Sequence, residues 1–114
     1  MSDCLFCKMV SGEIPVPKVF EDDSVIVIRD INPQAPYHFL AIPRAHFSAI
    51  HEVPADDPTL FEKLFSAVRT VIENEGLPEK GYRLVINSGS SAGQSVDHIH
   101  VHILSGRQLE WPPG

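Results

Sequence analysis

Short apolar runs alternate with clusters of turn-forming residues along most of the chain. Such runs are typical of β-strands, and they cover residues 18–21, 24–29, 37–42, 82–87 and 94–104. Residues 30–36 hold two prolines among polar turn residues, so this segment is expected to be a loop that presents Asp30 at a strand end.

The run at residues 94–104 has the most regular alternation. Successive side chains of a strand point to opposite faces, so its apolar residues are expected to face the core. The other face then carries three imidazoles, those of His98, His100 and His102. They are expected to stand about 6.6 Å apart, close enough to converge on one small ligand.

A further run repeats its apolar residues at three- and four-residue steps and predicts a long amphipathic helix. Asp57 is the expected N-cap, Pro58 the first helical residue, and Gly76 follows the end. A short helix is expected over residues 4–10. Together these elements predict an α+β protein, an antiparallel meander of five strands with the long helix on one face.

The length of the chain predicts its domain count, and its charge excludes some classes of binding partner. Its 114 residues predict one domain over 1–114, with 106–114 as a C-terminal tail. The net charge of -6 and the nine scattered basic residues argue against a nucleic acid polymer. No run is long and apolar enough for a membrane span, and the N-terminus lacks a signal segment. We therefore expect a cytoplasmic protein without a membrane partner.

Two kinds of chemistry fit the histidine face. Three imidazoles with an open position can hold a catalytic zinc, copper or iron ion. Alternatively, a neutral imidazole attacks phosphorus while a protonated neighbour assists the leaving group. The Gly- and Ser-rich segment 87–95 precedes the histidines and is expected to form an anion site from its N–H groups. An anion site beside the histidines favours phosphoryl chemistry, which requires no metal.

The residues 98–104 follow a pattern of three histidines separated by apolar residues, and 92–95 read Ala-Gly-Gln-Ser. Here the sequence resembles the histidine triad (HIT) family, most closely its small nucleotide-binding phosphoramidase (HINT-like) branch. Segments 13–15, 30–38, 42–46 and 107–114 look like that branch as well. The resemblance implies a HIT-like fold with two sheets joined in a symmetric homodimer, in which the tail and Trp111 reach toward the partner's site.

The same resemblance implies hydrolysis of purine nucleoside phosphoramidates of the AMP-amine type, through a nucleotidyl-histidine intermediate and without a required cofactor. His100 is then the nucleophile, and His102 contacts the phosphate and assists the leaving group. His98 and His38 complete the histidine cluster.

The resemblance also implies a nucleotide site. Asp30 is expected to accept hydrogen bonds from the ribose hydroxyls, although a turn-capping aspartate is the alternative. The phosphate is expected on Asn87, Gly93 and Ser95, and Gln94 is expected to belong to the same nucleotide site. The base is expected in an apolar slot of Phe6, Met9, Ile28 and Ile31.

Cys4 and Cys7 leave two interpretations open. Some family members with such a pair resemble zinc proteins that use both cysteines and the histidines at the positions of His46 and His98, a closed structural site. The alternative is two reduced thiols packed in the first helical turn.

Three other functions remain open from the sequence. The chain could be a nucleotide-binding regulatory protein with little turnover, or a dinucleotide polyphosphate hydrolase. It could also be a metal-dependent enzyme that uses the three histidines as ligands.

Overall fold

The computed structural model describes residues 3–114 and confirms the α+β class. Residues 1 and 2, where the predicted domain and its N-terminal stretch begin, lie outside the described residues. The strands are β1 (Lys18–Glu21), β2 (Val25–Arg29), β3 (Tyr37–Pro43), β4 (Tyr82–Val85) and β5 (Val101–Ser105). The helices are α1 (Leu5–Ser11) and α2 (Thr59–Asn74), with short 3-10 turns η1 (Ile50–Glu52), η2 (Leu77–Glu79) and η3 (Ser90–Ala92).

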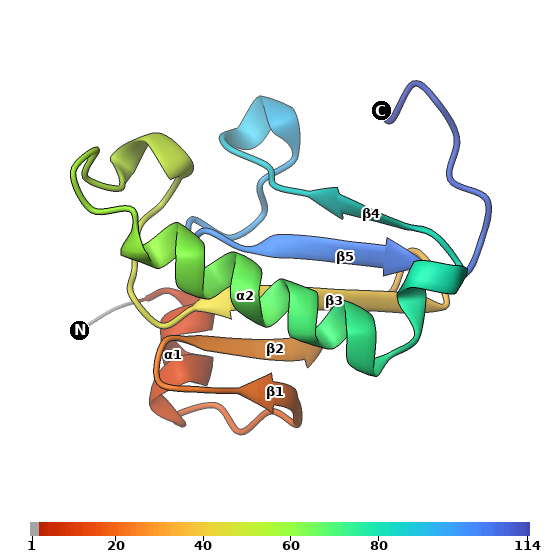
Figure 1. Ribbon diagram of the computed structural model, residues 1–114. Coiled ribbons are helices and arrows are strands. Elements are labelled where there is room, and N and C mark those ends of the chain that lie inside the picture. The colour runs from red at the N-terminus through yellow and green to blue at the C-terminus, as the bar shows by residue number, and fades with distance from the viewer. Residues whose placement is uncertain (1–2) are drawn as a thin grey trace.

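The five strands form one antiparallel sheet in the order β1-β2-β3-β5-β4 (Figure 1). The predicted meander is wrong at its end, because β5 lies between β3 and β4. After β3 and α2, the chain first forms the edge strand β4, and β5 then pairs with both β3 and β4. Val101 and Ile103 of β5 are fully buried there, whereas Tyr82 and Leu84 of the edge strand β4 are exposed.

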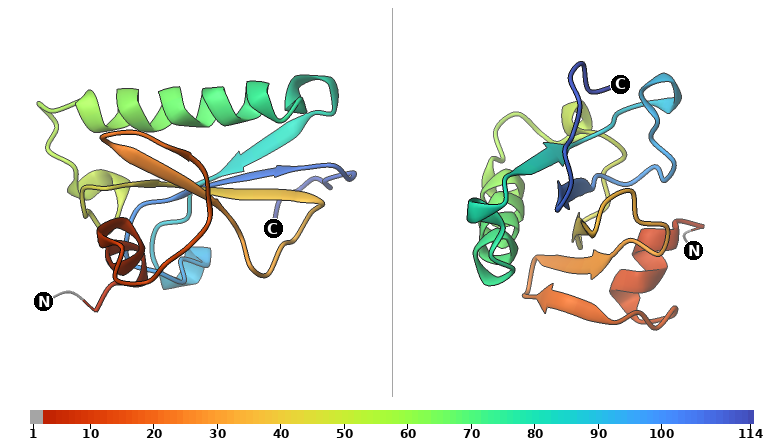
Figure 2. Two further views of the ribbon diagram at one scale, coloured as in Figure 1. Left: turned by 90° about the horizontal axis from the view of Figure 1, so that it is seen from below. Right: turned by 90° about the vertical axis from the view of Figure 1, so that its right-hand side faces the viewer.

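Both faces of the sheet are covered, α2 on one and α1 on the other (Figure 2). Alternation along the strands sends one set of apolar side chains to each helix. The α2 side is packed by residues that include Val25, Val27, Phe39, Ala41, Val101, Ile103, Leu64 and Val68. The α1 side is packed by Phe6, Ile26, Ile28, Leu40 and Ile42. His38 and His102 stand on this α1 side, as their pairing with Leu104 and Leu40 requires.

Helix α2 begins one residue later than the sequence predicts. Its N-cap is Pro58, which makes no side-chain cap bond, so the prediction of Asp57 as N-cap is wrong. The carbonyl of Pro58 instead accepts from the N–H groups of Phe61 and Glu62. Gly76 follows the helix with a left-handed φ of 71°, as expected.

The tail is tied to the loop before β3. Arg107 Nε donates to the carbonyl of Gln34 at 2.8 Å. Gly106 makes this approach possible, because a Cβ there would lie 2.9 Å from Pro36 Cβ, and its φ is 101°. Among the described residues, no helix has the length and apolar character needed to cross a membrane.

Candidate functional site

The predicted row of three histidines is only partly a strand. Strand β5 starts at Val101, so His98 and His100 belong to the irregular segment that leads into it. The rings of His100 and His102 lie 5.0 Å apart between centroids, and the ring of His38 lies 5.2 Å from that of His102. His98 instead points toward the cysteines of α1. All three imidazoles therefore lie on the α1 side as expected, opposite Ile99, Val101 and Ile103 in the other core. Only His100 and His102 adjoin His38, because the His98 ring belongs to the cysteine cluster.

His100 has a fixed pattern of protonation. The ring is buried, and its Nδ1 lies 2.8 Å from the carbonyl oxygen of His98. A carbonyl oxygen only accepts, so Nδ1 carries the hydrogen and, in the neutral ring, Nε2 holds the lone pair. Phe6 packs edge-on against this ring at 4.9 Å between centroids. His100 is thus held with a nucleophilic nitrogen at Nε2.

His102 has the complementary pattern, set by a relay that starts in the loop before β3. The backbone N–H of Gln34 donates to His38 Nδ1 at 3.0 Å, so the hydrogen of neutral His38 is on Nε2. His38 Nε2 lies 2.9 Å from His102 Nδ1 and donates to it. Neutral His102 therefore carries its hydrogen on Nε2. One imidazole of the pair offers a lone pair and the other offers an N–H.

Burial keeps these rings neutral. Desolvation lowers the pKa of His38 and of His100, and the charge of Asp30 opposes the shift in both. Desolvation, together with nearby His100 and His38, lowers the pKa of His102 to about 4. At pH 7 the relay therefore starts from neutral rings, which is the state that a nucleophilic His100 needs.

Asp30 approaches the cluster of His38, His100 and His102 from the end of β2. Its Oδ2 lies 3.4 Å from His38 Nε2, and its Oδ1 accepts from the N–H of Asn32 at 2.9 Å. The turn-capping interpretation of Asp30 is thus confirmed. The Asp30 carboxylate thus caps a turn with one oxygen and faces His38 with the other. Its contact with the ribose hydroxyls stays a prediction.

The predicted phosphate loop bends sharply between β4 and β5. Gly93 has a φ of 92°, and a Cβ there would lie 3.9 Å from Asn87 Nδ2, so these two residues lie close together. Gln94 braces the loop, since its Oε1 accepts from the N–H of Gly89 and its Nε2 donates to the carbonyl of Ser48. Both ends of that amide are used, which leaves Asn87, Gly93 and Ser95 as the better candidates for phosphate.

The residues of the predicted base slot do not share one environment. Phe6 and Ile28 are buried in the core under α1, and Met9 packs against that core at the surface. Ile31 is 97% exposed and Trp111 is 81% exposed. Of these residues, only Phe6 has a described contact with the ring of His100. Ile31 and Trp111 are exposed enough to contact a base or another chain.

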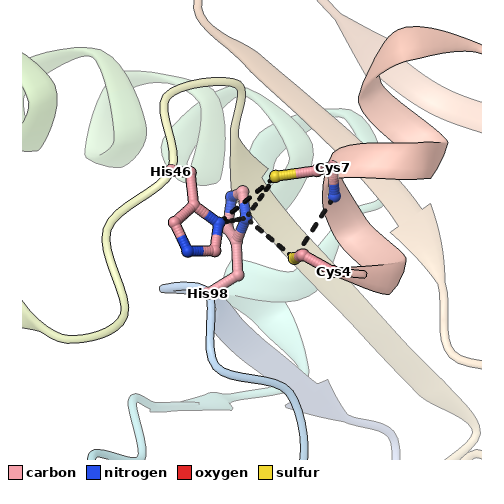
Figure 3. A group of neighbouring side chains, drawn as sticks. All are labelled: Cys4, Cys7, His46 and His98. Carbon is pink, nitrogen blue, oxygen red and sulfur yellow. Dashed lines mark hydrogen bonds between the residues drawn. The ribbon is translucent and has the colours of Figure 1, made fainter. Parts of the chain in front are cut away.

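A second cluster lies at the N-terminal end of α1 (Figure 3). Cys4, Cys7, His46 and His98 each offer one ligand atom, and these atoms all lie within 4.8 Å of one another. His98 Nδ1 lies 3.4 Å from Cys4 Sγ, 3.6 Å from Cys7 Sγ and 3.0 Å from His46 Nδ1. His46 Nδ1 lies 3.2 Å from Cys7 Sγ. A tetrahedral Zn²⁺ with two sulfurs and two nitrogens needs ligand separations of about 3.3–3.8 Å, so the set fits such an ion with small adjustments.

The far nitrogen of His98 supports this fit. Its Nε2 lies 2.7 Å from the carbonyl oxygen of Pro43 and must donate, which leaves the lone pair of Nδ1 aimed into the cluster. His46 is exposed, so its Nε2–H can be solvated while Nδ1 serves as a ligand. The residues present would therefore hold a soft divalent cation. Thiolate and imidazole ligands at all four positions would leave it no open site for substrate.

Among the described residues, Asp30, His38 and His102 form the other group of possible metal ligands. In this group, the hydrogen bond on Nδ1 of His38 disfavours metal binding. His38 Nδ1 accepts from a backbone N–H, so His38 Nε2 carries a hydrogen and cannot ligate unless that bond breaks. The hydrogen bonds of His38 thus disfavour a metal ion between Asp30, His38 and His102.

Sequence reasoning missed the backbone groups that set these protonation patterns. They are the N–H of Gln34 and the carbonyls of Pro43 and His98. Side-chain identity carries no signal for them, because any residue supplies a carbonyl.

Comparisons with known proteins find matches over nearly the whole chain. Residues 11–109 match the family model described as HIT domain. A HIT family hydrolase from Legionella pneumophila Philadelphia 1 superposes with a TM-score of 0.93 at 50% identity, covering 98% of this chain and 100% of that one. The 14 kDa zinc-binding protein of Zea mays is 46% identical over 99% of this chain and 89% of its own. A histidine triad nucleotide-binding protein from Candida albicans has a TM-score of 0.83 at 32% identity, covering 96% of this chain and 83% of that one.

Proposed function

Because the chain belongs to the HIT domain family, we propose that it hydrolyses purine nucleoside phosphoramidates through a nucleotidyl-histidine intermediate on His100. The observation that carries this proposal is the pairing of opposite roles on adjacent rings. His100 Nε2 offers a lone pair, while His102 Nε2 offers an N–H. Phosphoryl transfer to an imidazole needs both.

The first half-reaction forms a bond from His100 Nε2 to phosphorus and breaks the P–N bond. The amine leaves with the electron pair of that bond and takes a proton through His102 Nε2. In the free protein the pKa of His102 is about 4, and a phosphoryl anion beside the ring raises it, so His102 binds this proton as substrate binds. Asp30 Oδ2, 3.4 Å from His38 Nε2, then offers His38 another acceptor.

In the second half-reaction a water attacks phosphorus and the bond to His100 Nε2 breaks. The water returns a proton to His102 and the nucleoside monophosphate leaves. Overall, phosphoramidate and water give amine and nucleotide. No step uses a metal ion or a cofactor.

The nucleotide is proposed to lie along the α1 side of the sheet. Asn87, Gly93 and Ser95 receive the phosphate, and Asp30 accepts from the ribose hydroxyls. The base rests on apolar side chains near Met9 and Ile31. The nucleotide-binding name of the Candida albicans relative supports this choice of ligand.

We also propose a homodimer joined at β4. This edge strand has no partner on its outer side within the sheet of residues 3–114. Tyr82 and Leu84 are exposed beside Phe65 of α2, an arrangement that an added strand and helix would cover. Trp111 is open to a partner's site in the same way.

Zinc is the proposed occupant of the cluster of Cys4, Cys7, His46 and His98. The name of the Zea mays relative supports this metal. Because all four ligands come from the protein, the ion would stabilise the fold and leave the phosphoryl chemistry to the imidazoles.

The test is hydrolysis of adenosine 5′-phosphoramidate, followed by ammonia release. Mass spectrometry after a rapid acid-free quench should find one nucleotidyl group on His100. Tight AMP binding without turnover over several amine leaving groups would instead indicate a regulatory binding protein. Faster cleavage of a dinucleotide polyphosphate than of any phosphoramidate would reassign the substrate.

A further inference from the structure

His98 is shared by the two clusters, since its side chain enters the cysteine cluster and its carbonyl contacts the nucleophile. We propose that metal binding at Cys4, Cys7, His46 and His98 positions His100 for attack, with His98 as the positioning residue. This inference rests on the proposed function of His100. It goes further in giving the metal cluster control over the nucleophile.

The first link runs through the backbone. The His98 side chain is fully buried and reaches Pro43 with Nε2 at 2.7 Å and the cluster with Nδ1. The peptide that follows His98 is the one whose oxygen accepts from His100 Nδ1–H at 2.8 Å. The orientation of that oxygen therefore depends on how firmly the His98 ring is held. Metal ligation adds a second fixed point to the bond with Pro43.

The second link runs through α1. Cys4 caps this seven-residue helix and Cys7 lies in its first turn. Phe6 lies between the two cysteines in sequence, and its ring is 4.9 Å from His100 and 5.9 Å from His98, edge-on to both. So short a helix has little stability alone and depends on its contacts. Ligation of both cysteines would hold Phe6 against His100.

The two links act on the same property of His100. Loss of the carbonyl bond would let the hydrogen move to Nε2, and loss of the Phe6 contact would let the ring rotate. Either change removes the lone pair from the attacking position. Metal removal should therefore lower kcat about tenfold, less than the roughly hundredfold cost of a 1 Å misplacement, because only part of the protein would lose the Nδ1–H form. KM should change less than threefold.

The test compares zinc-loaded and chelated full-length protein labelled with ¹⁵N-histidine. Long-range ¹H–¹⁵N spectra report the tautomer of His100, assigned with a His100→Gln variant. We expect a single Nδ1–H form with zinc, a mixture without it, and recovery on adding zinc. A Cys4→Ser/Cys7→Ser variant should resemble the chelated protein and not respond to zinc. The control is Lys8→Ser, a change on α1 whose side chain only ion-pairs with Glu13 at 3.9 Å.

Several results would overturn the proposal. One is a protein that takes up no zinc from micromolar solution. Another is a His100 spectrum and kcat that agree within twofold with and without metal. If chelation unfolds the protein, zinc- and cadmium-loaded forms are compared, and identical His100 shifts count against the proposal. If no phosphoramidate is cleaved but the His100 tautomer follows zinc, the proposed function fails and the positioning role stands.

Discussion

His98 and His38 each have one ring nitrogen held by the backbone, but the backbone groups are opposite in kind. The Pro43 carbonyl accepts from His98 Nε2, whereas the Gln34 N–H donates to His38 Nδ1. His98 consequently points a lone pair at two cysteines, and His38 points an N–H at His102. The same side chain is prepared as a metal ligand in one cluster and as a proton donor in the other.

The comparison shows that the residues around a histidine do not by themselves define its chemistry. Asp30, His38 and His102 satisfy a distance criterion for metal binding as well as the cysteine cluster does. The hydrogen bonds on the far ring nitrogens separate the two groups. A metal-dependent enzyme built on the three histidines is therefore disfavoured, and the metal is expected only where His98 turns its lone pair.

The strongest test of this division removes one histidine from each cluster and measures both turnover and zinc content. His100→Ala removes the attacking nitrogen and should lower kcat/KM by about 10⁴-fold or more, while the zinc content of the protein stays the same. His46→Ala should do the reverse, because His46 is exposed and has no described contact with the catalytic rings. It should lose zinc and lower kcat only by about the tenfold proposed above for metal loss, far less than His100→Ala. Turnover in His100→Ala equal to wild type would refute the assigned nucleophile.

The next largest effect concerns stability. Zinc present at several hundred times its Kd should raise the free energy of unfolding by about 3–4 kcal/mol. Urea titrations with zinc and with a chelator measure the difference. His38→Ala is the matched control, because it alters the catalytic cluster only. It should bind one zinc per chain and show the same zinc-dependent gain.

A pH titration tests the neutral state of the catalytic rings. His102 has a folded pKa of about 4, whereas the ordinary pKa of a histidine is 6.5, so the unfolded chain binds more protons between these values. Stability should rise as pH increases from about 4 to 6.5 and be lost as pH falls through that window, by on the order of 1–3 kcal/mol. His38, whose pKa is also lowered, adds in the same direction.

The measurement is best made in the Cys4→Ser/Cys7→Ser variant, where metal release in acid cannot contribute. Adding His102→Gln should flatten the slope. A slope that is unchanged by this substitution would show that other groups cause the acid loss. AMP should move the NMR titration midpoint of His102 upward.

Much of the site could be predicted because its side chains lie close together in sequence or carry a specific pattern. The spacing of His98, His100 and His102 indicated imidazole chemistry, and the resemblance brought in His38 and the ligand set of the metal cluster. The short strands and α2 followed from apolar periodicity. These features depend on residue type, which a sequence states directly.

The hydrogen-bond roles of the individual ring nitrogens could not be predicted, because backbone groups set them. Strand alternation correctly placed His98 and His100 on the side of α1, although β5 starts only at Val101. It gave no indication that the Pro43 carbonyl would hold His98 Nε2 and leave Nδ1 facing the cysteines. Strand order failed for a similar reason, since the position of β5 beside β3 is decided by packing across the whole sheet. Local periodicity carries no information on either.

The smallest expected effect separates two carboxylates near the histidines. Asp30 lies 3.4 Å from His38 and its charge raises the pKa of His38, His100 and His102, whereas Asp97 is exposed and is not among the groups that shift them. Asp30→Asn keeps an oxygen for the Asn32 N–H but removes the charge. It should raise KM up to about tenfold, roughly 1.4 kcal/mol, and lower the pKa of His102 further. Asp97→Asn should change neither KM nor the pKa of His102, because Asp97 does not face His38 as Asp30 does. A KM rise of similar size in both variants would indicate a general electrostatic effect.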